Sequence, residues 1–130
     1  MGYHVVDPSG LDQWDDRDVD VRSISAAVGL DYEDAPLGLR TYEAAPGQQL
    51  PLAYHHHDEQ VEVFYVLEGQ LHVETPDETF VVERDQAFVV DPGSPHRAHN
   101  PDDAEASVRV LAIGAPSADD AQEYDPESAD

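Results

Sequence analysis

Between residues 37 and 113, short apolar stretches alternate with turn-forming residues. In the stretch 70–75, Leu71 and Val73 fall on one face and polar residues on the other, which is the pattern of a strand with one buried side. Glu68-Gly69 and the Asp-Pro-Gly run at 91–93 are turn signals between such stretches. Strands are predicted on this basis at 37–44, 50–57, 61–67, 70–75, 79–83, 87–90, 95–100 and 108–113. Short strands at this spacing favour an all-β sandwich or barrel.

The two ends of the chain show weaker patterns. The stretch 19–28 fits either a strand or a helical turn, and Trp14, the only tryptophan, is expected to anchor this region to the body. The tail after Pro116 is acidic and has no apolar stripe, so we expect it to be disordered. The sequence therefore predicts one domain, in which a segment 1–36 packs on a barrel 37–115 and an acidic tail 116–130 follows.

Length and hydrophobic content support a single domain, and the net charge narrows the classes of partner. With 130 residues, of which 40% are hydrophobic, the chain is long enough for one self-sufficient core. The 29 acidic residues outnumber the six basic ones, all arginines, and give a net charge of −23. That sign excludes a nucleic-acid partner, whose phosphates require Lys and Arg, and an anionic membrane surface. No apolar run reaches the roughly 18 residues that span a bilayer.

The acidic residues are spread along the whole chain, a pattern that resembles proteins of extreme halophiles with molar salt in the cytoplasm. Concentrated salt screens such self-repulsion, so we expect low salt to destabilise the fold and most carboxylates to be solvated. The absence of cysteine and of a recognisable leader fits a cytoplasmic protein.

Five of the seven histidines form two groups, at 55–57 and at 96 and 99. His55 and His57 share a strand face while His56 points away, and Glu62 reaches the same centre if the chain turns at 58–60. His96 follows the turn at 91–95 and supplies a third imidazole from a distant strand. Three neutral imidazoles and one carboxylate suit a divalent transition metal, although a solvated His-rich loop would give the same sequence.

The first histidine group resembles a known motif. Residues 55–69 contain His55, His57, Glu62 and Gly69 in the spacing His-x-His-x(4)-Glu-x(6)-Gly, which is similar to the first motif of the cupin superfamily.

The second group is similar to the second cupin motif, Gly-x(5)-Pro-x-Gly-x(2)-His-x(3)-Asn. Gly93, His96 and Asn100 match it, whereas Asp85 stands at the usual first Gly and Asp91 at the usual Pro. These two departures concern the local turns and leave the histidine in place.

The resemblance implies a jelly-roll barrel of the cupin type, a double-stranded β-helix, with one Mn, Fe, Co, Ni, Cu or Zn ion inside it. The metal ligands it implies are His55, His57, Glu62 and His96. His99 is expected on the opposite strand face from His96. Candidate substrate contacts, by position alone, are Phe64, Phe88, Tyr54, Gln60 and Arg40.

Two functions follow from the resemblance. One is a metal-dependent enzyme, for example a dioxygenase, decarboxylase or isomerase, acting on a small molecule. The other is a module that binds a sugar-like or carboxylate ligand without turnover. A homodimer is also expected, because the stretch 62–67 carries apolar residues on both strand faces and its second face needs cover from the N-terminal segment or a second subunit.

Overall fold

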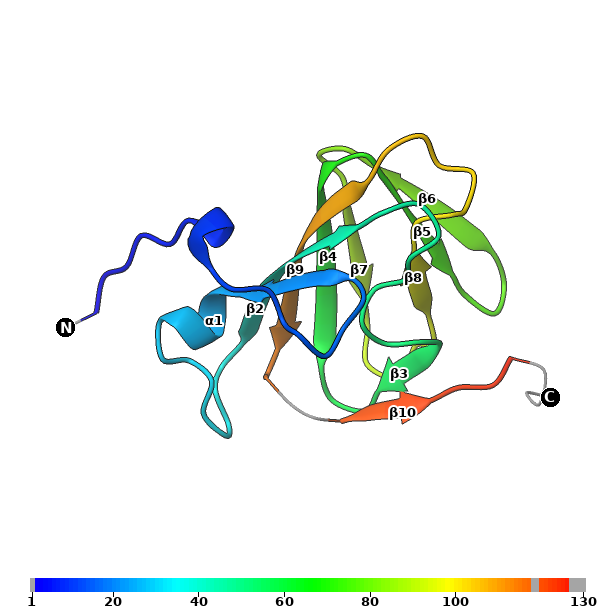
Figure 1. Ribbon diagram of the computed structural model, residues 1–130. Helices are drawn as coiled ribbons and strands as arrows, with labels where there is room; N and C mark the ends of the chain where they lie inside the picture. The colour runs from blue at the N-terminus through cyan, green and yellow to red at the C-terminus, as the bar shows by residue number, and fades with distance from the viewer. Residues whose placement is uncertain (1, 118–119, 127–130) are drawn as a thin grey trace.

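In the computed structural model, which describes residues 2–117 and 120–126, antiparallel sheets enclose a common interior (Figure 1). The largest sheet has five strands in the order β1-β2-β9-β4-β7, and it faces a three-stranded sheet, β6-β5-β8, and a pair, β10-β3. The strands are β1 (Asp20–Ser23), β2 (Gly38–Ala44), β3 (His55–His57), β4 (Val61–Glu68), β5 (Gln70–Glu74), β6 (Thr79–Glu83), β7 (Ala87–Val90), β8 (Arg97–His99), β9 (Val108–Ala115) and β10 (Ala121–Glu123). This all-β architecture is the predicted jelly-roll barrel, and strands β2 to β9 coincide with or overlap the eight predicted stretches.

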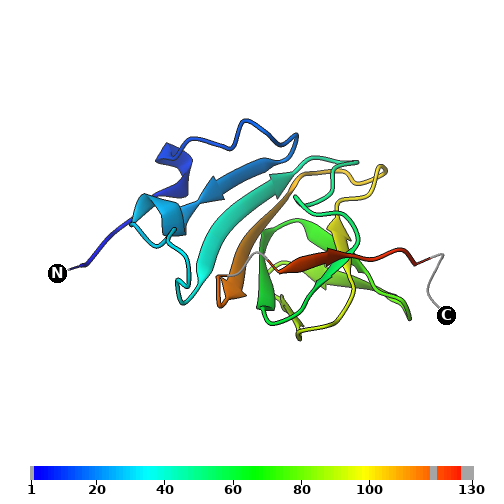
Figure 2. The same ribbon diagram turned by 90° about the horizontal axis from the view of Figure 1, so that it is seen from below.

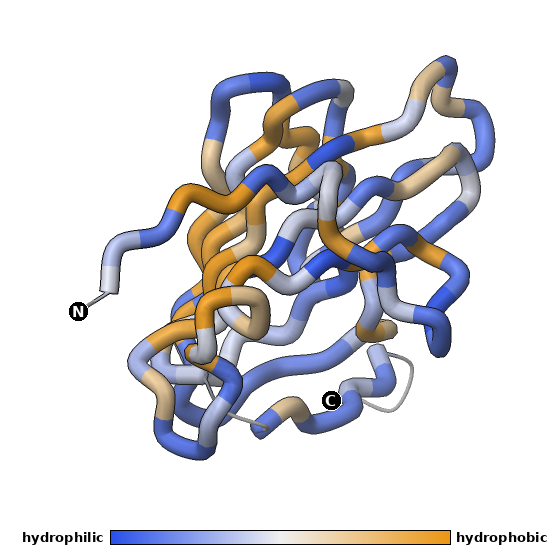
Figure 3. The backbone as a smooth tube through the Cα atoms, turned by 60° about the vertical axis from the view of Figure 1, so that its left-hand side comes forward, coloured by the Kyte–Doolittle hydropathy of each residue, from blue (hydrophilic) through white to orange (hydrophobic). Residues whose placement is uncertain are grey.

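The core lies between the two larger sheets, where alternate residues of each strand point inward. Val108 and Val110 of β9, Leu71 and Val73 of β5 and Val66 of β4 are almost completely buried. Figure 3 shows hydrophobic residues concentrated along the strands and hydrophilic residues in the connecting loops. The two-residue alternation of the sequence thus becomes an inner and an outer face.

Two tight turns depend on backbone conformations that few residues adopt. Gly69, between β4 and β5, has φ of 80°, and a Cβ atom there would lie 2.6 Å from the carbonyl oxygen of Ser107, so only glycine fits. Asp85 stands where the cupin motif usually has glycine, and it adopts φ of 66°. Aspartate tolerates this left-handed conformation better than most residues, so the turn is kept without glycine.

The region before residue 37 extends the five-stranded sheet at one edge. The stretch 19–28, whose sequence fits either a strand or a helical turn, forms both. Its first part is β1, which pairs with β2, and Ser23 then caps a single helical turn, α1 (Ile24–Ala27). The chain before a short 3-10 turn, Pro8–Gly10, extends away from the barrel (Figure 1). Among the described residues, no helix has the length and apolarity needed to cross a membrane.

The expectation of a disordered tail is wrong for residues 120–126. β10 pairs with β3, with Gln122 opposite His56, and crosses one end of the barrel (Figure 2). The ring of Tyr124 packs 5.0 Å from that of Tyr54. Backbone pairing with an edge strand needs no apolar stripe, so hydrophobic patterning could not reveal it. Ser117 is also held in place, because its N–H donates to the carbonyl oxygen of Ala35 at 3.1 Å. Residues 118–119 and 127–130 of the tail lie outside the described residues.

Candidate metal centre

A cavity of about 790 Å³ opens inside the barrel, and the predicted histidine cluster forms part of its wall. Strands β2, β4 and β9 supply one side, with Arg40, Phe64 and Ala112 among the lining residues. The N-terminal segment contributes Trp14 and Arg17 to the same lining. The site therefore combines two separate parts of the chain, the barrel and the segment before it.

Backbone pairing between distant segments brings the histidines together. His55 and His96 form an antiparallel bridge in which each backbone N–H donates to the other residue's carbonyl, at 3.0 and 2.8 Å. His57 lies two residues along β3, on the same face as His55, and both are buried, while His56 points outward and is only half-buried. The chain then turns at 58–60 before Glu62 enters from β4, as the spacing predicts.

Four side chains converge on one point. One ligand atom each of His55, Glu62 and His96 lie within 4.8 Å of one another. The Nε2 atom of His57 lies 3.1 Å from His55 Nε2 and 3.3 Å from Glu62 Oε1, and His96 Nε2 lies 2.8 Å from the same carboxylate oxygen. The three imidazoles and the carboxylate therefore form one cluster in which all the Nε2 atoms face inward.

The other ring nitrogen of each histidine is held from behind. Nδ1 of His55 is 2.6 Å from the carbonyl oxygen of Ala53, and Nδ1 of His96 is 3.0 Å from that of Ser94. Nδ1 of His57 instead lies 2.8 Å from the Asp120 carboxylate. Carbonyl and carboxylate oxygens only accept hydrogen bonds, so each Nδ1 must carry the proton.

This arrangement fits a bound cation. With the proton on Nδ1, each neutral ring presents an Nε2 lone pair to the centre, and the lone pairs of His55 and His57 then face one another at 3.1 Å beside a carboxylate. Without a cation, one of these two rings would have to take up a second proton, on Nε2, to form a hydrogen bond with the other. A divalent metal ion satisfies the same geometry with neutral rings, and three nitrogens with one oxygen suit first-row transition metals.

Electrostatics agrees with a site built for positive charge. Burial by itself would raise the pKa of Glu62, but in the metal-free cluster hydrogen bonds from the three histidines hold that pKa well below its ordinary value. Burial likewise disfavours the charged form of His57, yet Glu62 and Asp120 outweigh it and raise the pKa of this imidazole. The carboxylate at the centre is therefore ionised at neutral pH.

The candidate substrate contacts divide into two groups. Arg40, Gln60 and Phe64 line the cavity. Tyr54 and Phe88 are not among the described lining residues: Tyr54 packs on Tyr124, and the Phe88 ring lies 5.2 Å from that of Phe80. Both rings are used in packing against neighbouring strands, which position along the chain alone could not show.

The sequence analysis did not predict two residues of the site, Tyr42 and Asp120. Tyr42 lines the cavity two residues from Arg40, and strand alternation could have indicated it; burial raises the pKa of its hydroxyl, and the Arg40 charge opposes that rise. Asp120 had no usable signal, because its carboxylate is one of 29 acidic side chains and is 63 residues from His57.

The sequence profile of the cupin domain matches residues 40–114, more than half of the chain, and the chain therefore belongs to the cupin domain family. This confirms the resemblance seen in the two motifs. Among known proteins, the chain is 31% identical over 108 residues to the polyketide synthase CurC of Streptomyces cyaneus, covering 83% of this chain and 68% of that protein.

Solved structures share the fold. The polyketide cyclase RemF from Streptomyces resistomycificus superposes with a TM-score of 0.77 at 21% identity, over 95% of this chain and 87% of that one. A cupin 2 domain-containing protein from Halorhodospira halophila gives a TM-score of 0.68 at 19% identity, over 84% and 72% of the two chains. At these identities the likeness establishes the architecture only.

Proposed function

We propose that this protein binds one divalent transition-metal ion through His55, His57, Glu62 and His96, and that it promotes cyclisation of a small molecule that carries neighbouring carbonyl groups. The observation that carries the proposal is the convergence of three Nε2 atoms and one carboxylate at the wall of an open cavity. The naming of two similar proteins as a polyketide synthase and a polyketide cyclase supports this substrate class.

The bound metal would supply a Lewis acid that polarises carbonyl oxygens. The chain's own residues shape the rest of the cavity. Phe64 and Ala112 are buried neighbours on paired strands and give the cavity an apolar wall that limits water. Such a wall favours a compact ligand conformation in which two parts of one chain meet.

Gln60 is placed beside the cluster by a glycine. A Cβ atom at Gly114, the strand partner of Glu62, would lie 2.5 Å from Gln60 Nε2, so the absence of a side chain makes room for this amide. Gln60 Nε2 donates to the carbonyl oxygen of Pro116 at 2.9 Å, which fixes the orientation of the amide. We assign Gln60 to ligand positioning next to the metal ligands.

The test uses the whole chain, stripped of metal and then reloaded with single metals, and a synthetic tri-β-ketone as substrate. We expect a product formed by carbon–carbon bond formation and loss of one water, detected by mass spectrometry, only with the loaded protein. Glu62→Gln should abolish it, whereas His72→Gln, on the outer face of the barrel, should not. Undiminished turnover without metal would contradict the proposal.

Other outcomes point to the alternatives. Metal-dependent consumption of dioxygen would identify a dioxygenase instead. Tight metal-dependent binding without any turnover would favour the binding module over the enzyme.

We also propose that the protein forms a homodimer through the outer face of the five-stranded sheet. Leu39, Ile113, Val63 and Val89 lie in register across four strands there, and Val89 is 59% exposed. An uncharged row in a chain of net charge −23 offers a surface where two copies can meet without repulsion. A monomer mass by light scattering would contradict this assembly.

A further inference from the structure

The six arginines of the chain fall into two groups. Four of them have a carboxylate oxygen within 4 Å: Arg22, Arg84, Arg97 and Arg109. Within the part of the chain that the structure describes, Arg17 and Arg40 form no such ion pair, although the sequence holds 29 acidic residues. These two are also the arginines that line the cavity. Unpaired positive charge is therefore concentrated at the place where a ligand would bind.

Arg40 is held by its surroundings without being neutralised. Its guanidinium carbon lies 4.8 Å from the centre of the Trp14 ring, a cation–π contact that fixes the position of the charge and leaves it intact. Its Nε atom is buried and has no hydrogen-bond partner among the described residues. A buried donor of this kind costs free energy, which a ligand oxygen on the same guanidinium would help to offset.

Tyr42 lines the same cavity as Arg17 and Arg40. It is buried two residues beyond Arg40 on β2, and the charges that act on its hydroxyl are those of Arg40, Glu62 and Arg17. The two arginines, Tyr42 and the candidate metal ligand Glu62 all line the same cavity.

Strand register gives the spacing between the arginine and the metal ligands. Arg40 pairs with Ala112 of β9, and the next inward residue of β9, Gly114, pairs with Glu62 of β4. Arg40 and Glu62 are thus on the same face of the sheet with one strand between them, with Cα atoms roughly 12 Å apart across the sheet. A ligand of a few carbon atoms can reach both.

Acidic residues in the same lining do not neutralise this site. Asp31, Glu33 and Asp34 line the cavity from the loop between α1 and β2, but their side chains are exposed to water. Charges in water are screened, whereas a half-buried guanidinium over an indole ring is screened less. The loop therefore contributes exposed acidic groups to the cavity lining, and Arg40 is the less screened charge inside it.

We infer that Arg40, Arg17 and Tyr42 form an anion subsite, and that the ligand of this cavity carries a carboxylate there while its carbonyl end lies at the histidine cluster. The carbonyl end of this inference rests on the proposed function; the carboxylate end rests on the arginines alone. The ligand class is a β-dicarbonyl compound with a terminal carboxylate. A planar guanidinium suits a carboxylate because it donates two parallel hydrogen bonds.

The experiment compares two probes that differ only in that charge: succinylacetone, a β-diketone with a terminal carboxylate, and its methyl ester. Trp14 is the only tryptophan and touches Arg40, so its fluorescence reports occupancy directly. We expect the metal-loaded protein to bind the acid about tenfold or more tightly than the ester. The metal-free protein should bind both more weakly and keep the preference for the acid.

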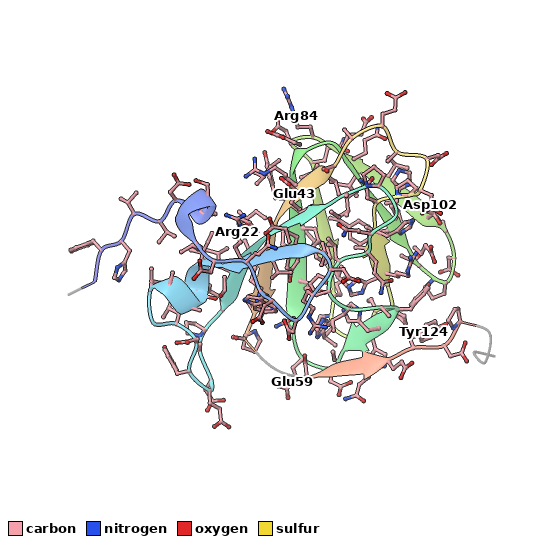
Figure 4. All side chains as sticks on the ribbon, viewed as in Figure 1. Arg22, Glu43, Glu59, Arg84, Asp102 and Tyr124 are labelled. Carbon is pink, nitrogen blue, oxygen red and sulfur yellow. The ribbon has the colours of Figure 1, made fainter. Side chains whose placement is uncertain are left out.

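Amino-acid substitutions test which residues cause the preference for the acid over the ester. Arg40→Gln should abolish it, lowering acid affinity and leaving ester affinity unchanged, and Arg40→Lys should restore part of it. Arg17→Gln changes an exposed side chain that does not endanger folding, and it should lower acid affinity by a smaller factor. The matched control is Arg84→Gln, whose side chain projects from the far end of the barrel (Figure 4), and it should behave as wild type.

The outcomes separate the inference from the proposed function. If the loaded protein binds acid and ester equally, or if Arg40→Gln keeps the preference, the anion subsite is wrong while the metal site stands. If the acid is preferred with and without metal, and metal changes neither affinity, the subsite stands and the metal-dependent function fails. If neither probe changes Trp14 fluorescence in either form, the inference is overturned.

Discussion

The barrel carries two groups of histidines on its two faces, and only one of them is arranged to bind a cation. The inner group is His55, His57 and His96, all buried around Glu62. The outer group is His72 and His99, which are opposite one another on β5 and β8 with their rings 5.9 Å apart. Residue type and proximity are therefore not enough to define a metal site.

The carboxylate partner makes the difference. The outer carboxylate, Glu74, accepts a hydrogen bond from Arg97 at 2.7 Å and lies 3.9 Å from His99 Nδ1. Among the described residues, the ion-pair partners of Glu62 are the three imidazoles of His55, His57 and His96. Because a guanidinium already neutralises Glu74, the outer group attracts no further cation, whereas the inner group has four donor atoms and no permanent positive charge.

The largest expected effect tests this comparison directly. Alanine at His55, His57 or His96 removes an inward donor atom, so each variant should lose most of the bound metal, measured by elemental analysis after gel filtration. Alanine at His72 or His99 should leave the metal content of the protein unchanged. Metal loss in His99→Ala together with retention in His96→Ala would show that the outer group is the true site.

The second prediction concerns Asp120, which holds the inner group from behind. Its carboxylate contacts Nδ1 of His57 at 2.8 Å and accepts backbone N–H groups of Glu59 and Gln60 at 2.7 and 3.0 Å. Asp120→Ala frees the His57 ring, and we expect metal affinity to fall by roughly 10- to 100-fold in a chelator competition.

A matched change on the same strand gives the control for Asp120. Glu123→Gln removes an exposed carboxylate of β10 without touching the cluster, and it should leave metal affinity as in wild type. If both variants lose affinity alike, the total charge of the tail matters and the contact with His57 does not.

The sequence predicted those features that depend on spacing. Strand alternation placed His55 and His57 together and His99 on the opposite face from His96, and the motif spacing indicated Glu62. It did not predict Asp120, because contacts between a tail and an edge strand leave no periodic signal.

The sequence also did not predict which side chains are used in packing. Tyr54 and Phe88 have the residue types of ligand contacts, but an aromatic partner elsewhere in the chain uses each of them. Asn100, which matches the motif, is buried and donates to the carbonyl oxygens of Ala44 and Ala106 at 3.0 and 2.9 Å. Asn100 thereby ties the end of β2 to the loop before β9, which only the three-dimensional contacts reveal.

The smallest expected effect comes from the outer group and depends on pH. Burial lowers the pKa of His99 below 6.5, and the Arg97 charge lowers it further. Between that lowered pKa and the unfolded value, the unfolded chain binds more protons than the native one, so the free energy of unfolding falls as pH falls below about 6.5.

His99→Gln removes this contribution, and in chemical denaturation of the metal-free protein its stability relative to wild type should improve from pH 7 to pH 5. The titrations of the inner histidines are common to both proteins and cancel in that difference. His4→Gln, on the exposed N-terminal segment, is the control and should show no such trend. A stability difference that stays constant with pH would mean that His99 is as free to take up a proton in the folded barrel as in the unfolded chain.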